Sequence, residues 1–329
     1  MKIIIPKELD LESTLNFCNI IDTNNDGVCA QEEYIYDYKD MSRVEPFGML
    51  IIASKIRCLV NENGKSVHKD KNFKSASGAK SYAAHMGFYQ SVYQDFGNKP
   101  GEAKGSDTYI PITEIKFSEL RKKKVHIYEY IENDSSRIAN ILSRGDNNLK
   151  EYLNFSVREL IRNVLEHSES DSLWYAGQYW KSNGIVEVAI LDEGIGIFQS
   201  LKKSKKVSVT NSSEAIIFAL EPGISKSGIG KEAKDEYDNT GFGLYMISRF
   251  CREAGEITIC SGGSCIVIEN GIIKDYETNF KGTAIRIRFN PEKLLNNKKV
   301  TYELSKEGNE IAKNYKKMNS IEMKDIVNI

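Results

Sequence analysis

The hydrophobic pattern of the chain is most informative in residues 159–167, which are predicted to form an amphipathic helix. At 100° per residue, the apolar residues of this stretch fall on one face. Glu159 and Asn163 are one turn apart on the other face, and His167 lies at its margin. A carboxylate beside an amide oxygen can bind a hard cation and deprotonate water, but an ordinary solvated helix face has the same pattern. The remaining sequence has to decide between these two interpretations.

Short strands and helices alternate in the first third of the chain. The pattern predicts strands at residues 2–5, 33–40 and 109–117 and helices at residues 10–21, 47–59 and 79–86. The helix that begins at Phe47 is apolar nearly all round, so we expect it to be buried. The polar stretches 61–78 and 94–108 are predicted to be loops. Residues 1–120 are therefore predicted to form a small α/β domain.

A second pattern begins after a basic run at residues 121–124, which we interpret as a junction. Helices are predicted at residues 125–145 and 147–167, and strands at residues 172–180, 185–191, 256–260, 264–269 and 283–289. Residues 197–239 form an insertion whose length indicates a lid. We therefore expect a linker with a helix at residues 121–146, a second domain at residues 147–290 and a charged, weakly helical appendage at residues 291–329.

Composition is consistent with two domains and disfavours several classes of protein. The 329 residues are too many for one core of the usual size, and 40% hydrophobic residues suffice for globular cores. The formal net charge of −1 does not indicate a nucleic-acid partner. No apolar run approaches the ~20 residues of a membrane span, and the N-terminal run is too short for a signal peptide. The six cysteines contain no CxxC pair, which favours reduced thiols and a cytoplasmic protein.

Residues 22–33 fit the pattern of an EF-hand calcium loop. Acidic or amide residues occupy positions 1, 3 and 5, Gly27 occupies position 6 and Glu33 occupies position 12. An EF-hand also requires a helix after Glu33, whereas the residues that follow alternate and are rich in aromatic side chains, as in a strand. Asn-Asn-Asp-Gly is in addition an ordinary turn signal. We therefore favour a helix-to-strand turn over calcium binding.

An Asp-X-Gly-X-Gly motif directly follows the predicted strand at residues 185–191. It consists of Asp192, Gly194 and Gly196. Glycines let the backbone come close to a ligand, and the carboxylate projects beside it. The motif therefore indicates a ligand site at the end of this strand.

A second glycine motif precedes an amphipathic stretch further along the chain. Gly241 and Gly243 form a Gly-X-Gly that is preceded by Thr240 and followed by Leu244. Free N–H groups and the dipole at a helix start bind anions, so this motif predicts a phosphate site. A Gly-Thr pair, in which Thr283 is the threonine, begins the last predicted strand.

The order of these four signals resembles that of the Bergerat-fold (GHKL) ATPases, the superfamily of gyrase, Hsp-type chaperones, histidine kinases and MutL. The similarity covers about residues 125–290. It implies an α+β fold in which helices cover a mixed sheet and a lid closes over ATP. It also implies that Glu159 is the general base, Asn163 the Mg²⁺ ligand and Asp192 the acceptor for the adenine amino group.

The same resemblance assigns the remaining motif residues. It implies that Gly194 and Gly196 form the wall of the adenine pocket, that Gly241 and Gly243, with Thr240 and Leu244, hold the phosphates, and that Thr283 supports the adenine through water. Lys226 and Lys231 lie in the predicted lid, where phosphate contact and solvated lid charges both remain open. His167 is interpreted as a polar residue that closes the edge of the pocket.

The N-terminal domain resembles the STAS-type fold of anti-sigma-factor antagonists. The resemblance rests on residues 34–40, a predicted strand that ends in acidic residues, and on the buried helix that follows from Phe47. Phosphorylated STAS proteins carry a serine at the start of that helix. Here Glu45 and Pro46 occupy this place and the nearest hydroxyl is Ser42, so phosphorylation by the protein's own chain is not expected.

Three functions are compatible with the sequence. The first is a regulatory switch in signalling, stress or defence that binds and hydrolyses Mg-ATP; the second is a serine/threonine kinase of the anti-sigma type, suggested by the spacing Glu-X-X-X-Asn-X-X-X-His. The third is a nucleotide-gated binding module without useful turnover, which the presence of Glu159 disfavours. A histidine kinase is disfavoured because the residues after His126 lack a phosphoacceptor pattern, and a gyrase- or MutL-like machine because 39 residues after Asn290 are too few. We expect a protein partner, with a homodimer as one form, and no membrane.

Overall fold

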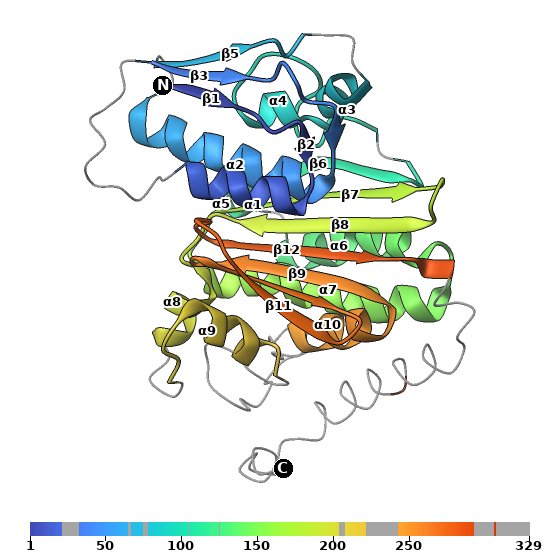
Figure 1. The fold of residues 1–329 in the computed structure, drawn as a ribbon. Helices are drawn as coiled ribbons and strands as arrows, with labels where there is room; N and C mark the ends of the chain where they lie inside the picture. Colours follow the sequence, from blue (N-terminus) through green and yellow to red (C-terminus); the bar gives the residue numbers. More distant parts are fainter. Residues whose placement is uncertain are drawn as a thin grey trace.

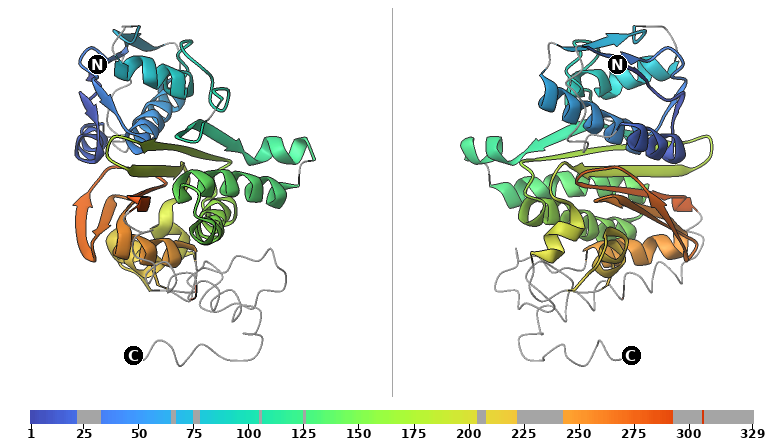
Figure 2. Two further views of the ribbon diagram at one scale, coloured as in Figure 1. Left: turned by 90° about the vertical axis from the view of Figure 1, so that its right-hand side faces the viewer. Right: turned by 60° about the vertical axis from the view of Figure 1, so that its left-hand side comes forward.

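The computed structural model describes residues 1–21, 33–64, 67–74, 78–104, 106–124, 126–203, 208–221, 243–292 and 306. These residues form a mixed α+β fold built in layers (Figure 1). A small sheet lies at one end, two helices separate it from a large sheet, and further helices cover the other face of the large sheet (Figure 2). Among the described residues, no helix has both the length and the apolar character needed to cross a membrane.

The small sheet consists of three parallel strands in the order β1 (Lys2–Ile4), β3 (Tyr34–Asp37) and β5 (His68–Lys71). Helices α1 (Leu11–Ile20) and α2 (Pro46–Asn63) belong to the connections between these strands and lie on the same side of the sheet (Figure 1). This is expected when successive right-handed crossovers proceed in one direction. The predictions of a strand at residues 2–5, a helix at residues 10–21 and a strand at residues 33–40 are confirmed.

Strand β5 lies within residues 61–78, which were predicted to be a loop, so that part of the prediction is wrong. Its sequence, His-Lys-Asp-Lys, contains no apolar residue. Backbone pairing with β3, and not a hydrophobic period, makes it a strand.

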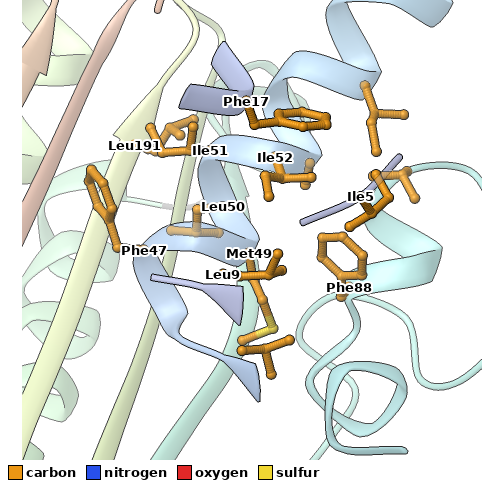
Figure 3. Packing of buried hydrophobic residues seen from close by; sticks show 14 of the residues in the cluster. Ile5, Leu9, Phe17, Phe47, Met49, Leu50, Ile51, Ile52, Phe88 and Leu191 are labelled. Atoms are coloured by element: carbon orange, nitrogen blue, oxygen red, sulfur yellow. The ribbon is translucent and has the colours of Figure 1, made fainter. Parts of the chain in front are cut away.

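Helix α2 is the main contact between the small sheet and the large one. It begins with Pro46 at its first helical position, and nearly all of its residues are buried, as the apolar sequence predicted. Its side chains point both toward Leu191 of the large sheet and toward Ile5 and Phe88 of the N-terminal unit, by which we mean the described residues up to 104 (Figure 3). One continuous hydrophobic core therefore joins the N-terminal unit to one face of the large sheet.

The large sheet has seven strands, and every neighbouring pair is antiparallel. Their order is β11 (Ile272–Glu277), β10 (Ser264–Glu269), β9 (Gly255–Ser261), β12 (Thr283–Phe289), β8 (Ile185–Asp192), β7 (Ser172–Trp180) and β6 (Tyr109–Lys116). The expectation of a mixed sheet is therefore wrong. Three short connections form hairpins, and the last strand inserts antiparallel between β8 and β9.

Two strands of the large sheet differ from the sequence prediction. Strand β6 falls within the predicted N-terminal domain of residues 1–120, but it pairs with β7 at the edge of the large sheet. Strand β11 was not predicted, because all six of its residues are exposed and its sequence carries no alternation of buried and exposed positions. The pairing of β6 with β7 joins segments that are distant in sequence, which a local pattern does not contain. Strand β11 instead forms by hairpin pairing with β10.

Helices α6 (Ile127–Ser143), α7 (Asn147–His167) and α10 (Gly243–Ala254) cover the other face of the large sheet around a second hydrophobic core. The two predicted helices at residues 125–145 and 147–167 are thus confirmed. Two helices of the predicted lid region are described, α8 (Gly196–Lys202) and α9 (Ser212–Ala219). The remaining elements are β2 (Glu8–Leu9), β4 (Arg43–Val44), α3 (Gly78–Met86), α4 (Phe88–Ser91) and α5 (Phe117–Lys122).

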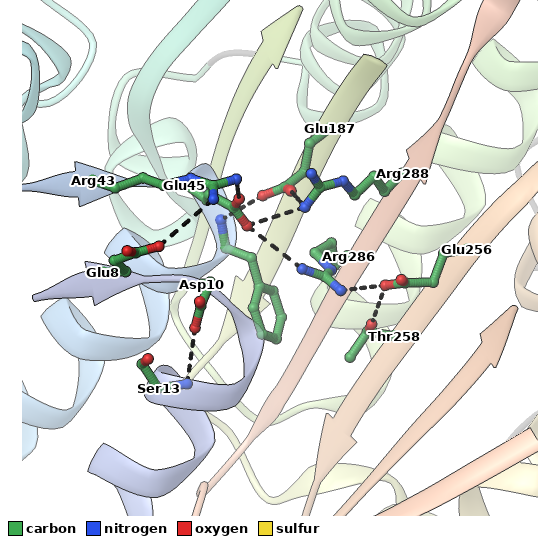
Figure 4. A network of polar contacts seen from close by, with 11 residues as sticks. Glu8, Asp10, Ser13, Arg43, Glu45, Glu187, Glu256, Thr258, Arg286 and Arg288 are labelled. Atoms are coloured by element: carbon green, nitrogen blue, oxygen red, sulfur yellow. Dashed lines mark hydrogen bonds and ion pairs between the residues drawn. The ribbon is translucent and has the colours of Figure 1, made fainter. Parts of the chain in front are cut away.

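A buried ionic network also joins the N-terminal unit to the large sheet (Figure 4). Glu45, which precedes α2, lies 3.1 Å from Arg288 and 3.7 Å from Arg286 of β12. Glu187 of β8 accepts a hydrogen bond from the Phe47 backbone N–H at 3.1 Å, and burial raises the pKa of its carboxyl. Glu45 is thus an ion-pair partner of the large sheet.

The candidate calcium loop lies outside the described residues, with the exception of Glu33. Glu33 forms an ion pair with Lys69 and leads directly into strand β3, so the strand predicted after this loop is confirmed. We therefore predict that millimolar calcium leaves the melting temperature unchanged. A thermal melt with and without calcium tests this, and a calcium-dependent rise that disappears in Asp26→Ala contradicts it.

Candidate functional site

A pocket with an empty volume of about 820 Å³ opens between helix α7 and the adjoining ends of β8 and β12. This volume includes space that is open to solvent. Its walls are mostly apolar and include Leu160, Val164, Ile190, Ile197, Leu244 and Ile285. The polar side chains that line it are Asn163, His167, Ser168, Asp192, Ser200 and Thr283. An apolar pocket with a few converging polar groups is typical of a ligand site.

Residues from four separate sequence motifs meet in this pocket. Asn163 comes from α7, Asp192 and Gly196 from the end of β8 and the turn after it, Leu244 from the start of α10, and Thr283 from the start of β12. These segments are up to 120 residues apart in sequence, so only the fold brings them together. Of the other predicted residues, Thr240, Gly241, Lys226 and Lys231 lie outside the described residues.

Helix α7 holds the Glu/Asn motif. The helix starts at a side-chain cap, in which Asp146 accepts a hydrogen bond from the Leu149 backbone N–H at 2.7 Å. Leu160 and Ile161 are buried in the second core, as the apolar stripe predicted. Asn163 and His167, one turn apart, line the pocket from the same helix.

Glu159 is fully buried and does not line the pocket. Its carboxylate accepts a hydrogen bond from Arg162 Nη1 at 3.0 Å in a buried ion pair. Gly243 packs directly against it, since a Cβ at position 243 would lie 2.2 Å from Glu159 Cβ. The start of α10 therefore requires glycine at this position, and Glu159 lies where α7 and α10 meet.

Asp192 ends strand β8 and lies opposite Thr283 of β12 in the sheet register. The Gly194 backbone N–H donates a hydrogen bond to Asp192 Oδ1 at 2.8 Å. Burial raises the pKa of Asp192 to about 7, which the hydrogen bonds from Gly194 and Thr283 partly oppose and the charge of Glu193 reinforces. A carboxyl group that titrates near neutrality at the base of a pocket is typical of a functional site.

The glycines of the Asp-X-Gly-X-Gly motif are required by close packing. A Cβ at Gly194 would lie 2.0 Å from the Ser168 carbonyl oxygen. Gly196 has φ +75° and a Cβ there would lie 2.9 Å from Ser261 Oγ. The turn is further fixed by the Ile195 N–H, which donates to the Ser168 carbonyl at 2.8 Å. The motif thus packs the turn against the C-terminal end of α7 and leaves Asp192 beside the pocket.

Several pocket residues were not among the sequence-predicted candidates. Ser168 follows His167 at the end of α7, and Ser200 lies on α8, one turn after Gly196. Helical spacing from the recognised motifs could have indicated both positions. Arg162 was also missed, although it lies three residues after Glu159 and would have indicated the ion pair.

In the described part of the chain, no three His, Cys, Asp or Glu side chains are grouped as they would be to hold a metal ion. Asn163 is the side chain in the pocket that the sequence assigned to Mg²⁺. An amide oxygen alone is a weak ligand, and Mg²⁺ is usually bound by one or two protein groups together with substrate phosphates. Asn163 could supply one such protein group.

No protein-family model matches this chain, and no curated protein matches it significantly.

Proposed function

We propose that the chain binds Mg-ATP in this pocket and hydrolyses it as a nucleotide-dependent regulatory switch, with residues 147–290 forming a Bergerat-type domain. The observation that carries the proposal is the meeting of Asn163, Asp192, Gly196, Leu244 and Thr283, from four separate motifs, in one pocket. The order of these motifs along the sequence also suggests ATP. The covering of one sheet face by α6, α7 and α10 is consistent with this fold.

The pocket chemistry suits an adenine base. A buried carboxylate accepts hydrogen bonds, and adenine offers an exocyclic amino group. Apolar side chains such as Ile190 and Leu244 can contact the flat faces of the ring. In this proposal Asp192 binds the amino group, Thr283 supports it, and Asn163 faces the phosphates and their Mg²⁺.

Hydrolysis requires a base, for which Glu159 is the proposed residue. It lies one turn before Asn163, but its carboxylate is paired with Arg162 and does not line the pocket. This observation favours a second candidate function, a nucleotide-gated binding module without useful turnover. In the ATPase proposal, Glu159 gains access to the phosphates when ATP is bound.

Incubation of the purified protein with γ-labelled ATP separates these functions. Free labelled phosphate supports the ATPase, labelled protein indicates a serine/threonine kinase, and retained ATP without either product indicates the binding module. The N-terminal unit, which we propose to be STAS-like because of its three parallel strands, would then transmit the nucleotide state to a protein partner. The absence of free phosphate, labelled protein and retained ATP together contradicts all three.

Nucleotide affinity is expected to rise with pH between pH 6 and 8. Because the pKa of Asp192 is raised to about 7, the carboxyl is mostly protonated at pH 6 and mostly ionised at pH 8, and the ionised form is the stronger acceptor. If only the ionised form binds, affinity falls about tenfold per pH unit below the pKa. Calorimetric titrations across this range test the prediction, and a flat profile contradicts it.

The Asp192 carboxyl has the opposite pH dependence in its contribution to the stability of the nucleotide-free protein. A carboxyl whose pKa is higher in the folded than in the unfolded protein favours folding below its unfolded pKa and loses that contribution as the pH rises through about 7. The contribution of Asp192 to folding therefore cannot account for a rise in affinity with pH.

A further inference from the structure

Arg57 of helix α2 is a buried charge that reaches from the N-terminal unit to the turn beside the pocket. It is 3% exposed. Its Nε and Nη2 both donate to Glu193 Oε1, at 2.9 and 2.6 Å, and its Nη1 donates to the Ser91 carbonyl at 3.2 Å. The guanidinium also lies 4.0 Å from the ring centre of Trp174 on β7. Four contacts from three elements therefore fix the orientation of this side chain.

Its partner Glu193 lies between two residues of the candidate site. Asp192 precedes it and lines the pocket, and Gly194 follows it and donates its N–H to the Asp192 carboxylate. A shift of the Glu193 backbone therefore changes the position of the Asp192 side chain as well. Arg57 thus contacts the site through a single intermediate residue, although it lies 136 positions away in sequence.

The contact is also electrostatic. Glu193 adds to the rise in the pKa of Asp192, and Arg57 places a positive charge against Glu193. His167, which faces the pocket from α7, is the other titratable side chain that lines it. Removal of Arg57 would leave the negative charge of Glu193 uncompensated next to Asp192.

We propose that Arg57 is a positioning residue for the pocket, which couples the N-terminal unit to nucleotide binding by holding Glu193 and thereby the turn that carries Asp192. This inference rests on the proposed function for the identity of the ligand, whereas the link itself can be measured without nucleotide. Coupling is reciprocal, so a ligand that stabilises the turn after Asp192 also stabilises the packing of α2 against the large sheet. The N-terminal unit would in this way sense whether the pocket is occupied.

The first test uses the nucleotide-free protein. Arg57→Met keeps the apolar part of the side chain and removes its charge. Arg57→Lys keeps the charge but loses the planar guanidinium with its several N–H donors. Glu193→Gln removes the negative charge of the acceptor. Arg43→Met, which removes an ion pair with Glu45 on the N-terminal side of α2, is the matched control. We expect hydrogen exchange at the Gly194 and Ile195 amides to become roughly tenfold faster in Arg57→Met, less so in Arg57→Lys, and to stay unchanged in the control.

The fluorescence of Trp174 provides an independent measurement of the contact between Arg57 and Glu193. The chain has two tryptophans, so Trp180→Phe leaves Trp174 as the only one. Loss of the guanidinium in Arg57→Met, or of its anchor in Glu193→Gln, should change the emission of Trp174 in this background. Unchanged exchange and unchanged emission in both variants overturn the inference, whether or not ATP binds.

The second test measures ATP affinity against pH. Arg57→Met should weaken binding roughly tenfold and move the midpoint of the pH dependence upward, because the charge of Glu193 is no longer compensated. Glu193→Gln should move that midpoint downward, and the double variant should resemble Glu193→Gln instead of adding the two effects. A merely structural role predicts weaker binding with no change of midpoint in any of the variants, and that result overturns the inference. If the parent does not bind ATP but exchange responds to Arg57→Met, the proposed function fails and the link stands.

Discussion

Glu159→Gln is expected to retain ATP binding and to lose most ATP hydrolysis. The substitution keeps size and hydrogen-bonding ability but removes the base, and a positioned base is worth about 10²–10⁴-fold in rate. Glutamine can still accept from Arg162 within α7, and it keeps the Cβ against which Gly243 of α10 packs, so both contacts should persist. The measurement is steady-state phosphate release beside nucleotide affinity. Unchanged turnover would remove the catalytic role and leave the binding module as the better proposal.

Asn163→Ala is the companion variant on the same helix. It removes the proposed Mg²⁺ ligand, so it should weaken Mg-ATP binding itself and not only turnover. If Glu159 and Asn163 were both ordinary helix residues, Asn163→Ala would change stability and nothing else. The pair therefore separates binding from chemistry, because each variant is expected to affect a different step.

Asp192→Ala and Asp192→Asn are expected to abolish the stabilisation of the protein by ATP. A ligand at one hundred times its dissociation constant stabilises the native state by about 2.7 kcal/mol, which raises the melting temperature by several degrees. Both variants remove the carboxylate that accepts from adenine, and asparagine keeps nearly the same shape. Because the pKa of Asp192 is about 7, the folded protein already accommodates the neutral carboxyl near neutral pH. Neither variant should therefore unfold the protein by itself, which melting without ATP verifies. If Asp192→Asn binds ATP as tightly as the parent, the adenine assignment is wrong.

Local patterns in the sequence were sufficient for most elements and for the pocket motifs. The strand at residues 172–180 coincides with β7, because its buried run is bounded by clear turns. The pocket residues that the sequence identified belong to short local motifs, such as one helix turn or a glycine turn. They are Asn163, Asp192, Gly196, Leu244 and Thr283.

Features that depend on distant contacts were not recognisable. The packing of α2 against the large sheet joins an apolar helix to apolar strand faces, and any such pair would satisfy the same hydrophobic pattern. The Arg57–Glu193 pair is invisible in sequence because a charged residue in a predicted helix is ordinarily solvated. The pairing of Glu159 with Arg162 follows from their helical spacing, but for the same reason its burial could not be distinguished from a solvated helix face.

Titration calorimetry of the parent protein with Mg-ATP and with Mg-GTP tests the central claim most directly. Adenine presents an amino donor where guanine presents a carbonyl acceptor. A pocket in which Asp192 accepts a hydrogen bond from the nucleobase should therefore bind ATP and reject GTP at pH 8. Saturable heat with ATP and none with GTP is the predicted result, whereas no binding of ATP, or equal binding of both nucleotides, would contradict the assignment of this pocket.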